Sequence, residues 1–154
     1  ARSVAWACAR DGASRVTIVN RTLARAEDVA ELLRRTTDLR EVSAVGLEGP
    51  ESREAASGAD VIVDCTSVGM YPRHNVEPVV PAAWLRAGQV VTDLTYNPLD
   101  TVLLEAARAA GAQTVDGAGM LVHQGAISLQ YWSGQEPPVE TMRAALLEAL
   151  GAPK

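Results

Sequence analysis

The sequence lacks the patterns that mark several classes of protein. Its two cysteines, Cys8 and Cys65, lie far apart in apolar surroundings, and neither has a paired spacing of the metal-binding or redox type. We therefore expect two reduced packing residues and no metal site. No run approaches the roughly 20 apolar residues of a membrane span, and no signal peptide opens the sequence. These features predict a cytoplasmic protein without a membrane partner.

Positive charge is also not concentrated anywhere in the chain. The 154 residues carry a formal net charge of -5 at pH 7, and the arginines are spread along the sequence. A nucleic-acid surface needs massed positive charge, so we expect no nucleic-acid partner. Hydrophobic residues make up 47% of the sequence, which suffices for one domain with a real core.

An alternating strand at residues 15–19 leads into a polar, basic tip. Its apolar residues are β-branched, as a buried parallel strand requires, and Asn20, Arg21 and Thr22 follow at its carboxyl end, where ligands bind in open α/β sheets. In a dinucleotide fold, an acidic residue here would hydrogen-bond the 2′-hydroxyl of NAD. That acid is missing and a cation is present, so the tip predicts a site for a 2′-phosphate.

The helix after the tip supports the same interpretation. Thr22 is the predicted N-cap, and Arg25 lies in the first turn, where a cation opposes the helix dipole. An anion bound between Arg21 and Arg25 would explain why two cations lie at the start of a helix. The alternative is a pair of ordinary surface arginines that contact Glu27 or Asp28. An apolar stripe is predicted to face the core: Leu23, Ala26, Val29, Ala30 and Leu33.

Strand and helix patterns alternate through the rest of the chain. Helices are predicted at residues 1–10, 51–58, 120–132 and 139–150, and after Asn97-Pro98 as far as Ala110. Strands are predicted at 41–46, 59–66, 89–96 and 113–117. Residues 71–81 are predicted to form an exposed loop with a solvated His74, and 81–85 a short helix or turn. This alternation predicts a parallel sheet with helices on both faces.

Only a helix precedes the first strand of this pattern. A dinucleotide fold begins with a strand and a glycine-rich turn that holds the pyrophosphate, and the sequence has neither. In the usual strand order 3-2-1-4-5-6, that strand lies between the strands that end at Asn20 and Thr66. We expect that a preceding segment of a longer polypeptide supplies it, or that another chain inserts a strand there.

Four motifs, in this order, resemble shikimate dehydrogenase. They are Asn20-Arg21-Thr22-x-x-Arg25-Ala26, Thr66-Ser67-x-Gly69-Met70, Asp93-x-x-Tyr96-Asn97-Pro98-x-x-Thr101-x-Leu103-Leu104 and Asp116-Gly117-x-Gly119-Met120-Leu121-Val122-x-Gln124, with Trp132-x-Gly134 behind them. The match spans essentially the whole chain but only the carboxyl-terminal, NADP-binding half of that enzyme. The resemblance implies a Rossmann-like, doubly wound α/β domain over residues 1–154, with a mainly parallel sheet that lacks its first strand and glycine-rich loop.

The resemblance implies NADP as the cofactor and two sets of residues that bind it. The first set would clamp the adenosine 2′-phosphate, in agreement with the charge argument: Asn20, Arg21, Thr22 and Arg25. The second set would border the rest of the cofactor: Thr66, Ser67, Leu94, Gly117 and Met120. For Thr66 and Ser67, capping of the following loop is the alternative.

The resemblance also implies that Tyr96 and Gln124 contact the substrate. Both side chains donate and accept hydrogen bonds, as recognition of a polyhydroxylated ring needs. The proton-transfer pair of the family, a lysine and an aspartate, belongs to an amino-terminal substrate domain that this sequence does not contain. The only lysine here is Lys154. We therefore assign no catalytic residue to this chain.

The implied reaction is the reversible reduction of 3-dehydroshikimate to shikimate with NADPH, in aromatic amino-acid biosynthesis. The chain alone is expected to be inactive, because the missing domain supplies the group that protonates the carbonyl oxygen. A dehydrogenase for quinate or another hydroxylated ring would share every motif. A non-catalytic nucleotide-binding regulatory module would need neither Tyr96 nor Gln124. The oligomeric state stays open, with a homodimer among the alternatives.

Overall fold

The computed structural model of the chain describes residues 1–151, so Lys154 lies outside the described part. The chain divides after Gly58 into two compact units, unit 1 at 1–58 and unit 2 from residue 59 onward. Each unit is described by itself. No helix within residues 1–151 has both the length and the apolar character needed to cross a membrane.

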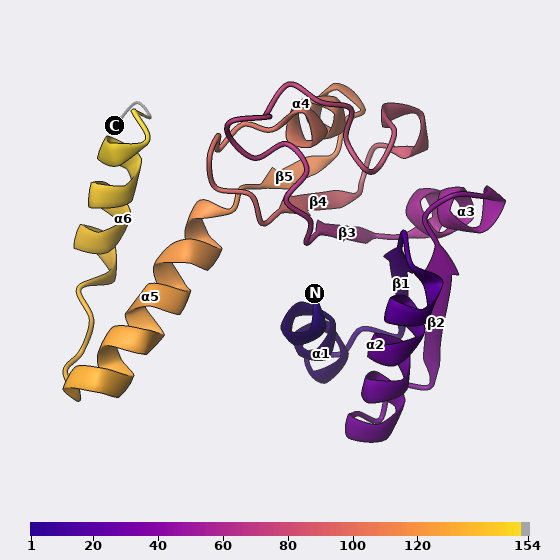
Figure 1. Cartoon of the computed structure of the whole chain (residues 1–154), viewed down its shortest axis with the longest axis horizontal. Helices are drawn as coiled ribbons and strands as arrows, with labels where there is room; N and C mark the ends of the chain where they lie inside the picture. Colours follow the sequence, from indigo (N-terminus) through magenta and orange to yellow (C-terminus); the bar gives the residue numbers. More distant parts are fainter. Residues whose placement is uncertain (152–154) are drawn as a thin grey trace. The chain divides into compact units, whose positions relative to one another are not determined.

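Unit 1 is a two-stranded parallel sheet with three helices (Figure 1). Its elements, in order, are α1 (Arg2–Arg10), β1 (Arg15–Asn20), α2 (Leu23–Thr36), β2 (Glu41–Gly46) and α3 (Pro50–Gly58). The register pairs Arg15 with Glu41 at one end and Asn20 with Gly46 at the other. Both strands therefore end at the same edge of the sheet, and the predicted phosphate site begins there with Asn20.

Helices α1 and α2 and the two strands together form the core of unit 1. It buries Ala5, Val29 and Leu33 against Val16, Ile18, Ala9 and Val42. The predicted apolar stripe of α2 is confirmed at four of its positions, Ala26, Val29, Ala30 and Leu33. Leu23 is the exception, at 45% exposed. It is the first residue of the helix, directly after the exposed residues Arg21 and Thr22.

Unit 2 is a three-stranded parallel sheet in the order β3-β4-β5. Its elements are β3 (Val61–Asp64), the 3-10 helix η1 (Ala82–Trp84), β4 (Val90–Asp93), α4 (Val102–Ala109), β5 (Gln113–Val115), α5 (Ala118–Ser133) and α6 (Val139–Ala149). Helix α4 packs on β4 and β5. The core beneath it consists of Leu85, Val91, Leu103, Leu104, Ala107 and Ala112.

Helices α5 and α6 form a hairpin at the end of unit 2 (Figure 1). The turn between them begins at Gly134, whose φ of 70° is in the left-handed region that glycine adopts without strain. A Cβ added at Gly125 would lie 3.2 Å from the Cε of Met142, so a glycine permits the close approach of the two helices. Helix α6 buries none of its residues.

Strands β3 and β4 are shorter than the predicted strands 59–66 and 89–96. The reason is an aspartate at the end of each strand, whose Oδ1 accepts a hydrogen bond from the backbone N–H two residues later, at 2.7 Å for Asp64 and 2.8 Å for Asp93. Such an Asx turn bends the chain out of the strand and takes a donor from the ladder. Asn20 and Asp116 make the same bond, at 2.9 Å and 3.0 Å. The same Asx turn therefore occurs at the ends of four strands.

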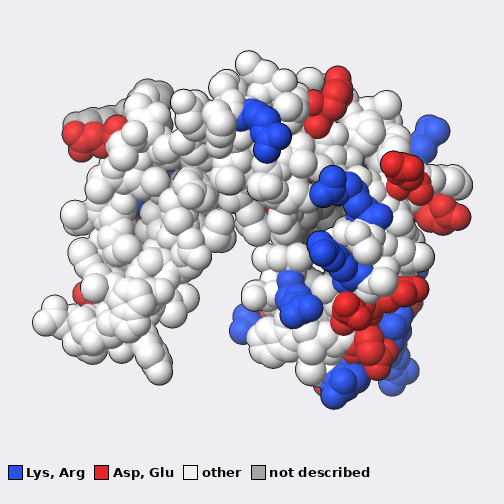
Figure 2. Space-filling view, in the orientation of Figure 1, with Lys and Arg blue, Asp and Glu red and all other residues white. Residues whose placement is uncertain are grey.

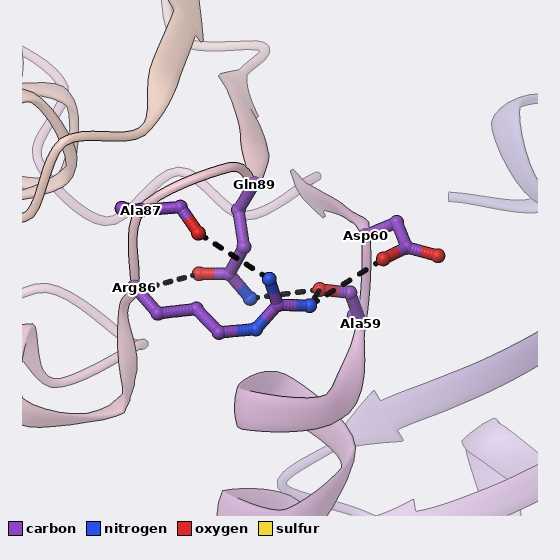
Figure 3. A network of polar contacts seen from close by, with 5 residues as sticks. All are labelled: Ala59, Asp60, Arg86, Ala87 and Gln89. Atoms are coloured by element: carbon purple, nitrogen blue, oxygen red, sulfur yellow. Dashed lines mark hydrogen bonds and ion pairs between the residues drawn. The ribbon is translucent and has the colours of Figure 1, made fainter.

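A polar network lies at the other end of the β3–β4 pair, where the two strands begin (Figure 3). Gln89 is fully buried; its Oε1 accepts from the backbone N–H of Arg86 at 2.9 Å, and its Nε2 donates to the carbonyl of Ala59 at 2.8 Å. The Arg86 guanidinium donates to the same carbonyl at 3.0 Å and contacts the Asp60 carboxylate at 3.4 Å. These contacts fix the amino ends of β3 and β4, away from the predicted site residues.

The pairing of the strands agrees with the predicted parallel topology. Every strand pair is parallel, β1 has β2 as its hydrogen-bonded neighbour, and β3 has β4. Within the described residues, β1 and β3 therefore each keep one unpaired edge. Val61 of β3 is 54% exposed, which differs from the buried strand that its apolar sequence predicts. Its position on an edge strand explains the exposure.

Candidate functional site

The basic tip of unit 1 is built on the end of β1 and the start of α2. The Oδ1 of Asn20 accepts from the backbone N–H of Thr22, which turns the chain and presents Arg21 between them. Thr22 is the N-cap residue of α2, as predicted, but its hydroxyl makes no capping bond. The first turn of the helix contains Arg25 and no acidic residue. The helix amino end therefore carries added positive charge beside its own dipole.

Arg21 and Arg25 are both exposed, and neither forms an ion pair with any of the residues that the structure describes. The alternative in which they contact Glu27 or Asp28 is not observed. Arginine side chains are visible over unit 1 in Figure 2, whereas the face shown over α5 has almost no charge. The tip thus provides two guanidinium groups, each with donors in a planar fork that suits a phosphate.

In unit 2, Thr66 and Ser67 follow the Asx turn at the end of β3. The Oγ1 of Thr66 accepts from the backbone N–H of Val68 at 3.1 Å, so the loop-capping alternative is observed for Thr66. The carbonyl of Ser67 accepts from Met70 N–H at 3.3 Å, which closes the turn. Both side chains remain exposed at the carboxyl edge of the sheet.

Gly117 lies against the end of β4. A Cβ added there would lie 2.3 Å from the carbonyl oxygen of Thr95 and 2.7 Å from that of Leu94. No side chain fits in that space, so only glycine allows the start of α5 to approach the strand end this closely. The structure therefore brings Leu94 and Gly117, two of the predicted cofactor residues, into direct backbone contact.

The remaining predicted residues lie on the same loops and on α5. Tyr96 is half-buried in the loop after β4, Met120 is half-buried in the first turn of α5, and Gln124 is exposed one turn later. All three follow the carboxyl ends of strands β4 and β5 along the chain. No side-chain hydrogen bond of Tyr96 or Gln124 occurs within residues 1–151, so both polar groups are available to a ligand.

Two buried carboxylates lie side by side beneath these loops. Asp64 and Asp93 are register partners in β3 and β4, and they are 6% and 1% exposed. Burial raises the pKa of the Asp64 carboxyl above its ordinary value; hydrogen bonding from Thr66 lowers it, and the charge of Asp93 raises it further. In the folded protein, Asp64 therefore holds its proton to higher pH than it does in the unfolded chain.

We expect Asp64→Asn to stabilise the protein at neutral pH. The folded state binds the Asp64 proton more strongly than the unfolded chain does, so the protonated side chain favours folding. This contribution to the stability is fully present below the ordinary aspartate pKa, about 3.9. It is lost as the pH rises through the raised pKa of the folded state. Asparagine cannot become charged, and its Oδ1 can still accept from Thr66 N–H. Thermal unfolding should be measured from below the ordinary aspartate pKa up to neutral pH. Once the pH exceeds the raised pKa of Asp64, the variant should have a higher Tm than the unmodified protein.

The exposed Asp38→Asn variant is the control for that experiment, since it removes a carboxylate that is neither buried nor hydrogen-bonded in the described structure. An Asp64→Asn protein whose Tm follows that of the unmodified protein at every pH would contradict the expectation.

Sequence reasoning missed the structural roles of three aspartates and one histidine. Asp64, Asp93 and Asp116 end three strands with the same Asx turn, and their recurring position after each apolar run was the available signal. His74 was predicted to be solvated, which is wrong. It is half-buried, its ring stacks on Tyr71 with centroids 6.2 Å apart, and its Nδ1 is buried without a hydrogen-bond partner within the described residues.

Comparison with known sequences relates this chain to one family. Residues 117–147 match a family described as the Shikimate 5'-dehydrogenase C-terminal domain. The shikimate dehydrogenase (NADP(+)) of Methanopyrus kandleri is 46% identical over 150 residues, which are 97% of this chain and 51% of the relative. That of Symbiobacterium thermophilum is 45% identical over 152 residues, again 97% and 51%. The chain spans about half the length of the curated relatives it matches.

Solved structures give the same result and establish the Rossmann-like fold. A shikimate dehydrogenase in complex with NADP+ has a TM-score of 0.82 at 38% identity, covering 96% of this chain and 50% of that one. The quinate dehydrogenase from Corynebacterium glutamicum in complex with NAD has 0.86 at 30%, covering 96% and 51%. The Thermus thermophilus shikimate dehydrogenase with NADP(H) and shikimate has 0.79 at 31%, also 96% and 51%. Motifs, matched domain and solved structures agree that this chain belongs to the shikimate dehydrogenase family, as a counterpart of the carboxyl-terminal part of its members.

Proposed function

We propose that this chain is the NADP-binding part of a shikimate dehydrogenase, which reduces 3-dehydroshikimate to shikimate with NADPH. The observation that carries the proposal is the basic tip after β1, where Arg21 and Arg25 are exposed without ion-pair partners among residues 1–151. The first turn of α2 also contains no acidic residue. Two free guanidinium groups at a helix amino end fit the 2′-phosphate that distinguishes NADP from NAD. The NADP(+) in the names of the relatives supports the same cofactor.

The proposal assigns a separate set of cofactor residues to each unit. In unit 1, the 2′-phosphate is bound by Asn20, Arg21, Thr22 and Arg25. In unit 2, Thr66 and Ser67 border the cofactor. Leu94 and Gly117 meet its nicotinamide side, mainly by backbone, and Met120 packs on the ring. NADPH supplies the hydride when it is bound. The close approach of Gly117 to the carbonyl oxygens of Leu94 and Thr95 supports the assignment of Leu94 and Gly117 to the same part of the cofactor.

We assign the substrate contacts to Tyr96 and Gln124, on a surface that the rest of the enzyme covers. Ile127 and Tyr131 lie three and seven residues after Gln124, on the same face of α5, and are 68% and 87% exposed. Large apolar side chains at this exposure favour a docking surface. We infer that its occupant is an amino-terminal substrate domain, which also supplies the proton-transfer groups, since the chain spans only half of its relatives. In this proposal, the complete enzyme comprises that domain, the expected first strand and glycine-rich loop, and this chain.

In the complete enzyme, we expect Tyr96→Phe and Gln124→Ala each to raise the KM for 3-dehydroshikimate about 2- to 13-fold, the equivalent of one neutral hydrogen bond. The KM for NADPH should be nearly unchanged, because neither side chain contacts the cofactor in this proposal. Steady-state kinetics with each ligand varied in turn measure both constants. Gln130→Ala is the matched control, since Gln130 is exposed on a different face of α5. Unchanged substrate kinetics in both variants would remove the physical support for these contacts.

A second candidate is a dehydrogenase that prefers quinate. The quinate dehydrogenase structure, with its TM-score of 0.86, supports it. The complete enzyme assayed with shikimate, quinate, NADP+ and NAD+ separates the two candidates. Preference for shikimate with NADP+ is the expected result, and preference for quinate with NAD+ would favour the alternative. Failure to oxidise any such ring, with NADP+ binding retained, would contradict both.

A further inference from the structure

The carboxylate of Asp93 is buried at the end of β4, and both of its oxygens accept hydrogen bonds. Asp93 is 1% exposed. Its Oδ1 accepts from the backbone N–H of Thr95 and its Oδ2 from the hydroxyl of Thr101, each at 2.8 Å. A carboxylate can remain buried only with partners of this kind, and such charge-assisted bonds are roughly twice as strong as neutral ones. Asp93 therefore restrains both threonines strongly.

Thr101 extends this restraint into helix α4. It is the N-cap of α4, and its hydroxyl accepts from the backbone N–H of Leu104 at 3.4 Å while it donates to Asp93. Thr101 is 2% exposed, and Leu104 belongs to the core of unit 2. The amino end of the helix also favours a neighbouring anion. One hydroxyl thus joins the end of β4 to the start of α4.

The segment between these two points, residues 94–100, carries Tyr96. Two backbone bonds hold it from outside: Leu94 N–H donates to the carbonyl of Asp64 at 3.0 Å, and the carbonyl of Asn97 accepts from Tyr71 N–H at 2.8 Å. The Tyr96 hydroxyl itself makes no hydrogen bond within the described part of the chain. The backbone on either side therefore determines where this hydroxyl lies.

We propose that Asp93 and Thr101 are positioning residues that hold Tyr96 in place for the substrate. The inference rests on the proposed function, in which Tyr96 contacts a shikimate-type ring. Asp93 and Thr101 are 1% and 2% exposed, so we assign them no direct contact with a ligand. They act by fixing both ends of residues 94–100, and such fixing matters because a displacement of about 1 Å can cost on the order of 100-fold in rate.

Thr101→Val tests the inference in the complete enzyme, because valine keeps the shape of threonine and loses its hydroxyl. We expect the KM for 3-dehydroshikimate to rise about tenfold while the KM for NADPH changes less than about twofold. Thr101→Ser, which retains the hydroxyl, should restore the substrate KM. A merely structural role predicts a different result: less active enzyme, hence a lower apparent kcat, with both KM values unchanged.

A double variant tests whether Thr101 acts through Tyr96. In a Tyr96→Phe background, Thr101→Val should raise the substrate KM little further, because the contact that it positions is already lost. Should Thr101→Val fail to fold, Asp93→Asn is expected to raise the same KM, since it removes the charge and keeps an acceptor for Thr95 N–H.

Three outcomes decide between the two proposals. An unchanged substrate KM in an active Thr101→Val enzyme would overturn this inference, and so would full additivity with Tyr96→Phe. A wild-type enzyme that binds NADPH and reduces no ring substrate would instead overturn the proposed function.

Discussion

Arg21→Ala in the complete enzyme is expected to weaken NADPH binding about 10- to 150-fold, the equivalent of the roughly 1.5 to 3 kcal/mol of a charge-assisted hydrogen bond. NADH has no 2′-phosphate, so its binding should be nearly unchanged. The side chain is exposed and forms no ion pair with residues 1–151, so its removal leaves no buried partner unsatisfied in unit 1. Fluorescence titration with each cofactor measures both dissociation constants.

Arg35→Ala is the matched control for Arg21→Ala. Arg35 is exposed in the last turn of the same helix, far from the tip, so it tests whether any lost arginine on α2 has this effect. Asn20→Asp provides a second test, because aspartate can keep the bond from Thr22 N–H while it adds a negative charge. That variant should also shift preference toward NADH, by repulsion of the phosphate. Equal loss for both cofactors in Arg21→Ala would refute the phosphate clamp.

The elements of unit 1 were predictable because their signals are local. Residues 15–19 alternate and are β-branched, and the stripe from Ala26 to Leu33 has helical spacing, so pattern alone places β1 and α2 correctly. Leu23 deviates although it fits the spacing, because it is the first residue of α2 and follows an exposed tip. The spacing of apolar residues along the chain does not show whether the first residue of a helix is buried.

The ends of β3 and β4 were predicted less well for a different reason. Apolar and β-branched residues continue past Asp64 and Asp93, and the pattern favoured longer strands. In the structure, each aspartate side chain competes with the ladder for a backbone N–H and ends the strand early. That these two carboxylates are buried neighbours follows from the strand register, which sequence reasoning did not determine. The bond from Thr101 to Asp93 joins residues eight positions apart and could not be predicted from the sequence.

Gly117→Ala is expected to lower the stability of the protein by about 2 to 4 kcal/mol, as severe overpacking does. The new Cβ would lie 2.3 Å from the carbonyl oxygen of Thr95, and no side-chain rotation can relieve a clash with backbone. The φ of Gly117 is -79° and its ψ is -5°, which alanine adopts without strain, so the expected loss is purely steric. The strand end at Leu94 and the start of α5 must then separate, and NADPH binding should weaken with stability.

Gly119→Ala isolates this steric effect, because a Cβ added at Gly119 meets nothing within 4 Å. Gly119 lies inside α5, where alanine is favoured over glycine by roughly 0.5 to 1 kcal/mol, so this variant should keep or slightly raise the Tm. Thermal unfolding of both variants beside the unmodified protein gives the comparison, with a decrease of roughly 5 to 15 °C expected for Gly117→Ala. If both substitutions shifted the Tm equally, the close approach of Gly117 to the end of β4 would not be what requires glycine there.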